Sequence, residues 1–565
     1  MPGVVLAFCF HGPLVAAGFY RFSWDASTHI FFADHYRRSW FALWDPRWFG
    51  GFSVSSYPPL GHQLIALLSF PFGYDRAFAI LLLSMLVVFP VAAWRFALVF
   101  VAPAAASFAA IVAAFVPGVA LAAHSYGQLP TLMSLTVTLF LVFEFTRFVE
   151  RGGGLRLGLV AALAGTAFAT HHATPMFFLP PALLAGLSTV IIGVDKGALS
   201  GRLRRAGIAT ACAVVTAAFV IFPFWLWAIA GIHEAFIPHG SRANFLADFG
   251  AQARFLWAVY GVLPALAIVG LRIRSDRRTV ALAILAGCMA ILGLGGTTPI
   301  PSLVFGRQWE WLTYDRFALW GAVALVPLAG IAVHNLLSVH AAAARAVTLA
   351  ALVLLMAYAS FGTGVSFLGP DLRPQPDVRP IADFINNRRT QWRYQTFGVG
   401  NAATQLSYLT PAATIDGAYY SARRVPELAA SGIGMLDAAL LLDPSGAVLR
   451  RVLAHANAYG IRWAFVLDPR YDPYLNAAGF ARNGSLAGRV TVWENQTAPP
   501  VPAAALRFGV PDFEGILWGT LPLASLFVAL VLAVAQSMAG VLEEDRSRRS
   551  FSTPSRLRPQ PVGNP

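Results

Sequence analysis

The sequence predicts a polytopic α-helical membrane protein with about twelve transmembrane helices and a small extracytoplasmic α/β domain. Charged residues make up only 12% of the 565 residues and hydrophobic residues 57%, with a mean hydropathy of +0.62. A soluble domain carries roughly 25% charged residues. Apolar stretches of about 20 residues, the length that crosses a bilayer, recur along most of the chain. Residues 365–511 lack such stretches and show short mixed helix and strand patterns.

Twelve segments are long and apolar enough to be predicted as spans. They cover residues 3–20, 76–100, 104–123, 128–148, 156–171, 174–193, 206–230, 255–271, 279–295, 316–335, 344–364 and 513–539. Pro and Gly occur inside several of them, which bilayers tolerate better than water does. Residues 58–73 are too short to span comfortably, so we expect an interfacial helix there.

Basic residues predict the orientation of these spans. Under the assignment above, the arginine and lysine clusters all fall on one side of the membrane. They comprise Arg147, Arg151, Lys196, Arg202, Arg204, Arg205, Arg272, Arg274, Arg277, Arg278, Arg546, Arg548 and Arg549. The positive-inside bias makes that side cytoplasmic and accounts for the net charge of +14 without a nucleic-acid partner. For the first segment, a cleaved signal peptide is the alternative to a transmembrane helix.

The chain then divides into four parts in the plasma membrane. These are a transmembrane core (1–364) with a first external loop (21–75), an extracytoplasmic α/β domain (365–511), a last transmembrane helix (512–540) and a disordered cytoplasmic tail (541–565). The tail is rich in Arg, Ser and Pro, a composition typical of disorder. Within the domain, the pattern predicts a helix over 381–388 and strands over 462–467 and 490–493.

An acid and a histidine follow the first span directly. Asp25 and His29 are four residues apart and share one face of a helix, whereas Asp34, nine residues from Asp25, points away. A carboxylate at an apolar boundary can have its pKa raised and serve as a general base. Asp is also a good N-cap residue, so helix capping is the alternative role for Asp25, and the two roles are compatible.

Aromatic and basic residues alternate further along this loop. Trp40, Trp44 and Trp48 lie close to Arg37 and Arg47. One interpretation is an amphipathic element at the level of the lipid headgroups. The other is a docking surface for a phosphorylated lipid or a sugar.

These motifs carry a resemblance to a known class. The Asp25–His29 pair, the stretch Trp44-Asp45-Pro46-Arg47-Trp48-Phe49-Gly50-Gly51 and the stretch Tyr57-Pro58-Pro59-Leu60 resemble the first external loop of the GT-C membrane glycosyltransferases. Residues 312–335 and 458–463 are similar to further parts of this class. The chain most resembles the branch known as "6-pyruvoyl-tetrahydropterin synthase-related" membrane proteins, a label that implies no pterin chemistry.

The resemblance implies an enzyme that transfers a sugar from a polyprenyl-phosphate-linked donor to an extracytoplasmic acceptor, usually with inversion. The acceptor would be a glycan, a lipid or a protein. An Asp similar in position to Asp25 is the base in this class, with His29 supporting it. Several members carry a second acid in the next external loop, but this chain has His124 and Gln128 there. We therefore expect no metal and no cofactor.

An arginine enters the tenth predicted span from outside. Arg316 is costly in that position unless it is paired or used, and Asp315 beside it is a candidate partner. Snorkelling to the interface is the alternative. In GT-C proteins a similarly placed Arg contacts the lipid phosphate, which implies that role for Arg316.

The remaining candidate substrate-binding residues are polar or aromatic side chains of the predicted external loops. They are Asp34, Trp48, Tyr57, His124, Gln128, His171 and His172. Two other functions stay open on the sequence alone. A transporter or flippase for lipid-linked glycans would show charges deep in the spans and inverted repeats, neither of which is clear here. A non-catalytic membrane scaffold is the third hypothesis. No Walker A motif occurs, so we expect no direct use of ATP.

Overall fold

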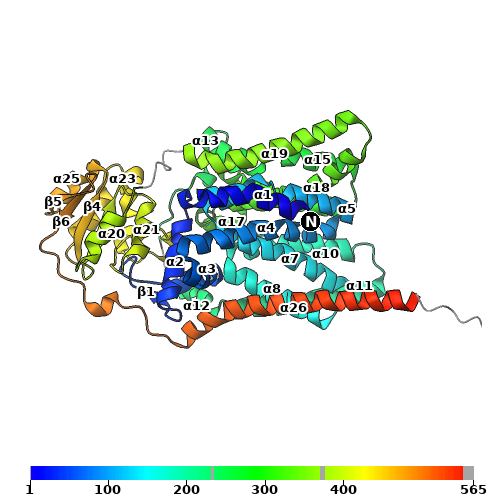
Figure 1. Cartoon of the computed structure of the whole chain (residues 1–565), viewed down its shortest axis with the longest axis horizontal. Coiled ribbons are helices and arrows are strands. Elements are labelled where there is room, and N and C mark those ends of the chain that lie inside the picture. The colour runs from blue at the N-terminus through cyan, green and yellow to red at the C-terminus, as the bar shows by residue number, and fades with distance from the viewer. Residues whose placement is uncertain (1, 231–233, 369–375, 552–565) are drawn as a thin grey trace, which may run out of the picture.

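A computed structural model of the chain describes residues 2–230, 234–368 and 376–551, with side chains described except at 365–368 and 540–551. It shows a long body of helices with a small α/β domain at one end (Figure 1). The helices of the body are α1 (Pro2–Ala16), α2 (Ala26–Arg38), α3 (Leu60–Phe72), α4 (Tyr74–Phe100), α5 (Pro103–Ala113), α6 (Pro117–Ala120), α7 (Leu129–Arg151), α8 (Gly154–Thr170), α9 (Ala173–Phe177), α10 (Leu179–Ile191), α11 (Lys196–Val220), α12 (Phe222–Ala230), α13 (Phe249–Gln252), α14 (Ala258–Tyr260), α15 (Leu263–Ile273), α16 (Arg277–Gly293), α17 (Ile300–Phe305), α18 (Asp315–Ser338), α19 (Ala342–Leu368) and α26 (Phe513–Phe551).

Six helices are long and apolar enough to cross a membrane, namely α4, α7, α11, α18, α19 and α26. Two further segments reach that length only across a bend: α5 with residues 117–126, bent by 40°, and residues 249–260 with α15, bent by 45°. Every predicted span overlaps helical backbone, although α1, α8, α10 and α16 are shorter than 18 residues. The membrane-protein class is thus confirmed, while the number of twelve spans stays a prediction.

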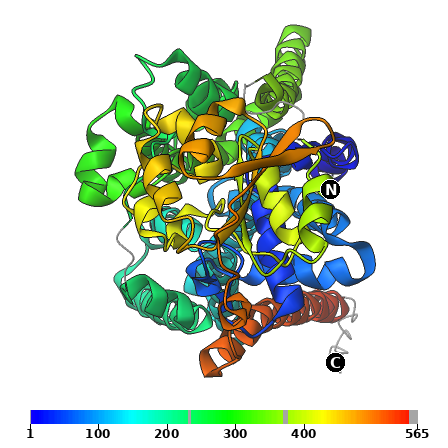
Figure 2. The ribbon, with the colours of Figure 1, turned by 90° about the vertical axis from the view of Figure 1, so that its left-hand side faces the viewer.

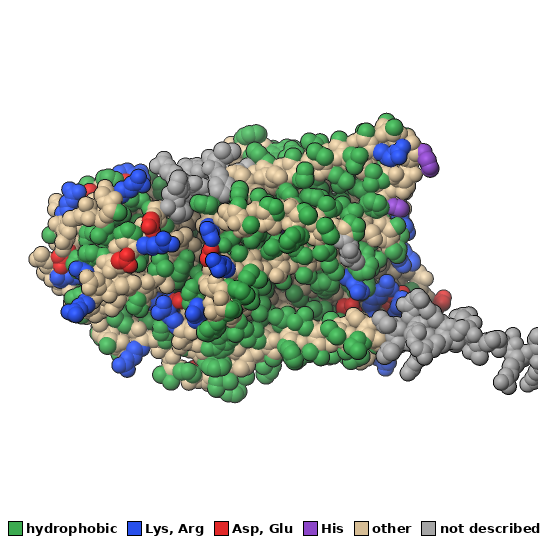
Figure 3. Space-filling model, in the orientation of Figure 1, with side chains coloured by type: hydrophobic (Ala, Val, Ile, Leu, Met, Phe, Trp, Pro, Cys, Tyr) green, Lys and Arg blue, Asp and Glu red, His purple; other side chains and the backbone are tan. Residues whose placement is uncertain are grey.

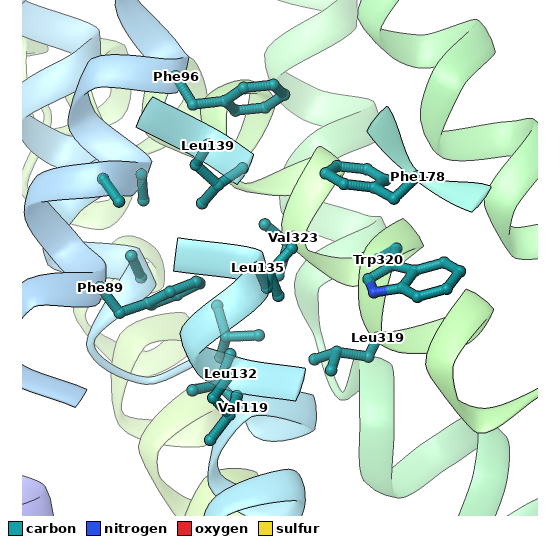
Figure 4. Close-up of a cluster of buried hydrophobic side chains, with 14 of the residues drawn as sticks. Phe89, Phe96, Val119, Leu132, Leu135, Leu139, Phe178, Leu319, Trp320 and Val323 are labelled. Atoms are coloured by element: carbon teal, nitrogen blue, oxygen red, sulfur yellow. The ribbon is translucent and has the colours of Figure 1, made fainter. Parts of the chain in front are cut away.

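The centre of the body is formed by α7 and α18. In the most apolar 18-residue stretch of each helix, 83% of the α7 stretch and 89% of the α18 stretch is buried inside the protein. Leu132, Leu135 and Leu139 of α7 lie toward Trp320 and Val323 of α18 (Figure 4). Small residues let the helix backbones approach closely where α18 crosses its neighbours, which is the usual way that membrane helices pack. A side chain at Gly330 of α18, for example, would collide with the backbone of α5.

The outer helices α11, α19 and α26 expose most of their apolar side chains. The space-filling view shows a broad hydrophobic surface along the body, with charged side chains gathered toward its two ends (Figure 3). A soluble protein rarely exposes apolar patches of this size, but a lipid bilayer covers them. This surface agrees with the fold class derived from the composition.

The loops predicted to be cytoplasmic meet at one end of the body. Arg205 Nε donates to the carbonyl oxygen of Val149 at 2.8 Å. Glu144 accepts from Arg156 Nε at 3.1 Å and from Gln536 Nε2 at 2.9 Å, which joins α7, the start of α8 and the far part of α26. Figure 1 places this end, together with the N-terminus, opposite the small domain.

The last helix differs from its prediction. The final span is predicted to end at residue 540, with a disordered tail from 541, whereas the backbone of α26 continues as a helix to Phe551. Residues 552–565 of the predicted tail lie outside the described residues.

The small domain is built on a four-stranded sheet in the order β3–β4–β6–β5. Its strands are β3 (Arg393–Phe397), β4 (Ile461–Val466), β5 (Ala481–Leu486) and β6 (Val490–Glu494), and its helices are α20 (Arg379–Asn386), α21 (Ala402–Leu409), α22 (Pro426–Ala429), α23 (Ala439–Leu442), α24 (Ala447–Ala454) and α25 (Asp472–Ala477). β3 runs parallel to β4 and the other pairs are antiparallel. The predicted helix and both predicted strands are confirmed. Two strands were not predicted: β3, an edge strand that is largely buried although its sequence mixes polar and aromatic residues, and β5, a polar edge strand exposed over Ala481–Ser485.

Residues 21–75 form a folded unit between the helical body and the small domain (Figure 1), and in the end-on view the small domain lies in front (Figure 2). Helix α2 and α3 are joined by a hairpin of β1 (Trp44–Asp45) and β2 (Phe52–Ser53). Trp48 stacks on Phe31 with ring centroids 3.7 Å apart, and its Nε1 donates to Ser407 Oγ of the small domain at 2.8 Å. Only 1% of Trp48 is exposed, so its interpretation as part of a headgroup-level belt is wrong.

A buried ion network holds the same unit together. The Arg47 guanidinium pairs with Asp34 and with Asp45, whose carboxylate also contacts His35 Nδ1 at 3.0 Å. Asp34 additionally accepts from Tyr74 OH at 2.6 Å. These side chains are almost wholly enclosed. Because removing one partner would leave a buried charge unpaired, the network fixes α2 against the hairpin.

Candidate active site

Asp25 lies between α1 and α2, directly before the first residue of α2. Its backbone is hydrogen-bonded to the bent helical segment of residues 117–126. The amide of Trp24 donates to the Ser125 carbonyl at 3.3 Å and the amide of Asp25 to the Tyr126 carbonyl at 2.9 Å. Residues 121–126 form a π-helix, a local widening that is frequent at functional sites. Gly127 follows with φ +69°, and a side chain there would collide with Ser23.

The Asp25 carboxylate makes no hydrogen bond to any residue that the structure describes. Asp25 occupies the N-cap position of α2, but its backbone is helical and its side chain accepts no capping bond. The capping alternative derived from the sequence is therefore wrong for the side chain. A carboxylate left without a protein partner in this position remains available to a ligand.

Burial raises the pKa of Asp25 from 3.8 to about 6, and the Arg316 guanidinium opposes this rise while Asp315 adds to it. A group of this pKa is largely ionised at pH 7 and can still take up a proton readily, as a general base must. Burial also lowers the pKa of His29 to about 3, and Arg316 acts in the same direction. His29 is thus neutral at physiological pH.

Arg316 begins α18 and has no ion-pair partner among the residues that the structure describes. Its Nε is enclosed and lacks a hydrogen bond. The predicted pair with Asp315 is not formed, because Asp315 Oδ2 accepts from Gln128 Nε2 at 3.3 Å instead. A partly buried guanidinium without a paired carboxylate is costly, so its charge is available to an anionic group.

The charge of Arg316 reaches several residues that the sequence analysis selected. Asp25 and His29 lie within its electrostatic range, as do Tyr57, His171 and His172. The structure therefore brings together side chains that are far apart in the chain. His171 is also fixed by a hydrogen bond between its Nδ1 and Thr174 Oγ1 at 2.9 Å.

The other predicted ligands are placed differently. His124 is buried at the π-helix and contacts His11 Nδ1 of α1 through its Nε2 at 3.0 Å. Gln128 lies at the edge of the site through its bond to Asp315. Asp34 and Trp48 belong to the buried contacts beneath the small domain, and neither has a described contact with Asp25. Substrate binding by these four residues stays a prediction.

Two tyrosines of the small domain complete the site, and sequence reasoning did not identify them. Tyr419 OH donates to the Ser56 carbonyl at 2.8 Å, and its ring lies 5.4 Å from that of Tyr57. Burial raises the pKa of Tyr420 to about 12, with Asp25 contributing, although 40% of Tyr420 is exposed. Tyr420 therefore lies within electrostatic range of Asp25 and is still accessible from outside the protein.

A segment near these tyrosines ties the small domain to a loop of the body. Arg423 pairs with Glu234 at 3.2 Å, and both side chains are almost fully buried. The amide of Ala235 donates to the Ala429 carbonyl at 2.6 Å. The loop after α12 and the segment that carries Tyr419 and Tyr420 are thus joined next to the site.

Comparison with known proteins places this arrangement in a fold. No family model and no curated protein matches the sequence. ArnT from Cupriavidus metallidurans in its apo state aligns with a TM-score of 0.54 at 15% identity, over 88% of this chain and 99% of ArnT. The same protein bound to undecaprenyl phosphate aligns with a TM-score of 0.52 at 14% identity, over 84% of this chain and 94% of ArnT. The chain has the GT-C fold.

A third solved structure agrees with this assignment of a GT-C fold. The arabinofuranosyltransferase AftD from Mycobacteria aligns with a TM-score of 0.50 at 12% identity, over 91% of this chain and 41% of AftD. The fold expected from the motifs of the first loop is confirmed. The narrower resemblance to the "6-pyruvoyl-tetrahydropterin synthase-related" branch stays a prediction, because no family model matches.

Within residues 2–230, 234–368 and 376–551, no group of three or more His, Cys, Asp or Glu is placed to hold a metal ion. Near Asp25 the groups present are a second acid bound to an amide, neutral histidines and an unpaired arginine. Their chemistry fits general-base catalysis beside a bound anion.

Proposed function

We propose that this chain is an inverting glycosyltransferase that moves a sugar from a polyprenyl-phosphate donor to a cell-envelope glycan, lipid or protein. One observation carries the proposal: Asp25 lies within electrostatic range of Arg316, and neither side chain has an ion-pair partner among the described residues. The GT-C fold supports it, since ArnT shares that fold and has been solved with undecaprenyl phosphate bound.

In the proposed reaction Asp25 removes a proton from an acceptor hydroxyl as its oxygen attacks the anomeric carbon of the sugar. The bond from that carbon to the phosphate oxygen breaks, and its electron pair leaves with the polyprenyl phosphate. Attack from the face opposite the leaving group inverts the anomeric centre. Arg316 binds the phosphate oxygens and stabilises the charge that develops on them.

The proposed site is extracytoplasmic. The arginine-rich loops meet at the end of the body opposite the small domain, and such loops stay in the cytoplasm. Asp25 and Arg316 lie near the small domain, so they face the other side, and the C-terminus is cytoplasmic. Tyr57, His171 and His172 are proposed to contact the substrates around them.

Binding of undecaprenyl phosphate tests the anion site directly. The purified full-length protein in nanodiscs should bind this lipid, and Arg316→Gln should weaken binding about 10- to 100-fold, the loss expected for charge-assisted hydrogen bonds. Arg21→Gln is the matched control, because Arg21 pairs with Asp75 at the protein surface. Equal affinity of the Arg316→Gln and wild-type proteins would contradict the proposal.

Transfer itself is tested in the source organism. A deletion strain should lose one class of glycan and accumulate a lipid-linked sugar, as seen by mass spectrometry of both pools. Wild-type protein should restore the profile, and Asp25→Asn should not, although it inserts at the same level. An unchanged profile in the deletion strain, or full complementation by Asp25→Asn, would refute the assignment.

A further inference from the structure

His62 of α3 makes a contact to which neither the motifs nor the proposed reaction assigns a role. Its Nε2 lies 3.0 Å from His29 Nδ1, and the two rings are stacked with centroids 5.2 Å apart. His62 is fully buried, with Phe32 stacked on it at 4.8 Å. His29 lies one turn after Asp25 on α2, so the contact connects α3 to the face that carries the proposed base.

The two free nitrogens of this pair have different surroundings. His62 Nδ1 is enclosed and has no hydrogen-bond partner. His29 Nε2 likewise has no partner among the described residues, but it is not among the enclosed atoms, and the His29 ring lies within electrostatic range of Arg316. Tyr57, with its ring 5.9 Å from that of His29, and His171 also face this histidine.

These surroundings distinguish the two possible proton arrangements. If His29 Nδ1 carried the shared proton, neutral His62 would hold its own proton on Nδ1, leaving a buried N–H without an acceptor, which is rare in proteins. If His62 Nε2 carries the shared proton, only a bare ring nitrogen is enclosed. His29 then holds its proton on Nε2 and offers an N–H toward the site.

We propose that His62 is a positioning residue that holds His29 as a neutral Nε2–H donor, aimed at the anion that Arg316 binds. The inference rests on the proposed function, because that anion is the phosphate of the lipid-linked sugar. His29 then adds a hydrogen bond to a phosphate oxygen without adding a second buried charge. A neighbouring histidine is a common way to set which nitrogen of a functional histidine carries the proton.

The matched variants are His62→Gln and His62→Asn. The Gln amide reaches the position of Nε2 and can still donate to His29 Nδ1, whereas the Asn amide is shorter and ends near the position of Nδ1. We expect His62→Gln to bind undecaprenyl phosphate within about 2-fold of wild type, and His62→Asn to bind about 5- to 10-fold more weakly, the loss of one hydrogen bond. Equal binding by His62→Asn and wild type would overturn the proposal.

A spectroscopic measurement reports on the proton without any ligand. Nitrogen NMR of histidine-labelled full-length protein in lipid bilayers distinguishes the two neutral forms, and His29→Gln identifies the signals of His29. We expect the Nε2–H form in wild type and His62→Gln, and a mixture in His62→Asn. Finding the Nδ1–H form in wild type would refute the inference, even where Arg316→Gln shows that the phosphate site is correct.

Tyr36→Phe is the control for disturbance of α2. Tyr36 lies on the same helix, is buried, and accepts a hydrogen bond from Trp518 Nε1 at 2.8 Å. Its loss should leave the His29 signal and lipid affinity unchanged. If Tyr36→Phe weakened binding as much as His62→Asn, the effect of His62 would be structural. Should Arg316→Gln bind normally, the proposed function would fail, and the NMR result would still decide the role of His62.

Discussion

Asp25→Asn should make the protein more stable while it abolishes transfer. Burial raises the pKa of Asp25 from 3.8 to about 6, and one unit of pKa corresponds to about 1.36 kcal/mol. Holding this carboxylate ionised in the folded protein at pH 7.5 therefore costs up to about 3 kcal/mol, and somewhat less because the side chain is partly exposed. Removing the charge removes that cost.

The sign of this effect separates catalysis from capping. Loss of an N-cap destabilises a helix by about 1 kcal/mol, so Asp25→Ala would lower stability if Asp25 were mainly a cap. In the absence of a capping bond, we expect Asp25→Ala and Asp25→Asn both to raise the midpoint of thermal unfolding. Differential scanning fluorimetry of the purified protein in one detergent measures this midpoint.

The pH dependence gives a second check on the same carboxyl group. Its folded pKa is raised, so its stabilising contribution is complete below about pH 3.8 and is lost as the pH rises through about 6. The midpoint of wild type should therefore approach that of Asp25→Asn when the pH falls from 7.5 to 5. Other titrating groups cancel because the two proteins share them.

Two outcomes would refute this reasoning. One is a lower midpoint for Asp25→Asn than for wild type at pH 7.5, and the other is a gap between the two proteins that does not change with pH. Asp75→Asn is the matched control, because Asp75 pairs with Arg21 at the surface, with Nε to Oδ1 at 3.0 Å. Its substitution should not raise the midpoint.

Three further outcomes follow from other parts of the structure. The transfer rate of membranes carrying the wild-type protein should fall about tenfold from pH 7 to pH 5, because a base of pKa about 6 is mostly protonated at pH 5. A transfer rate that does not change with pH would contradict the role of Asp25 as the base. Arg47→Leu should destabilise by about 3–5 kcal/mol, because Asp34 and Asp45 then lie buried without a counter-charge; loss of folded protein in size-exclusion chromatography measures it. Gly127→Ala should reduce transfer strongly at a normal expression level, because the alanine methyl group would displace Ser23 and hence Asp25. Unchanged transfer activity would show that the backbone around residue 127 can move without affecting the site.

Much of the fold was predictable because the bilayer imposes a strong compositional signal. All twelve predicted spans overlap helices, since runs of apolar residues have no other stable form in lipid. The bends after α5 and α14 were not predicted. Pro117 stands at the first bend, and Gly261 (φ +51°) and Pro264 stand at the second. Such residues interrupt a helix, but hydropathy along the chain does not register them. The two inner strands of the small domain, β4 and β6, are predominantly apolar and were predicted, whereas the edge strands β3 and β5 have mixed or polar sequences and were missed.

The site was predictable only where one segment supplies several residues. Asp25 and His29 are linked by helical spacing, and Tyr57 by a local motif. Tyr419 and Tyr420 belong to the small domain, more than 350 residues along the chain, and only the three-dimensional fold brings them to Asp25. The pairing of Arg316 was expected from the adjacent Asp315, but adjacent residues on a helix point in different directions.

The two acids Asp25 and Asp34 show how the loop separates stability from chemistry. Asp34 is held by Arg47, Arg38 and Tyr74, so its negative charge stabilises the folded loop. Asp25, nine residues earlier, has no such partner in the part of the chain that the structure describes, although Arg316 lies within electrostatic range. If Arg316 paired with Asp25 directly, the carboxylate would be too weak a base and the arginine would be occupied. Because Asp25 and Arg316 are not paired, both charges are available to a substrate that carries a hydroxyl and a phosphate. The absence of an ion pair between them therefore argues for an enzyme more strongly than an ion pair would.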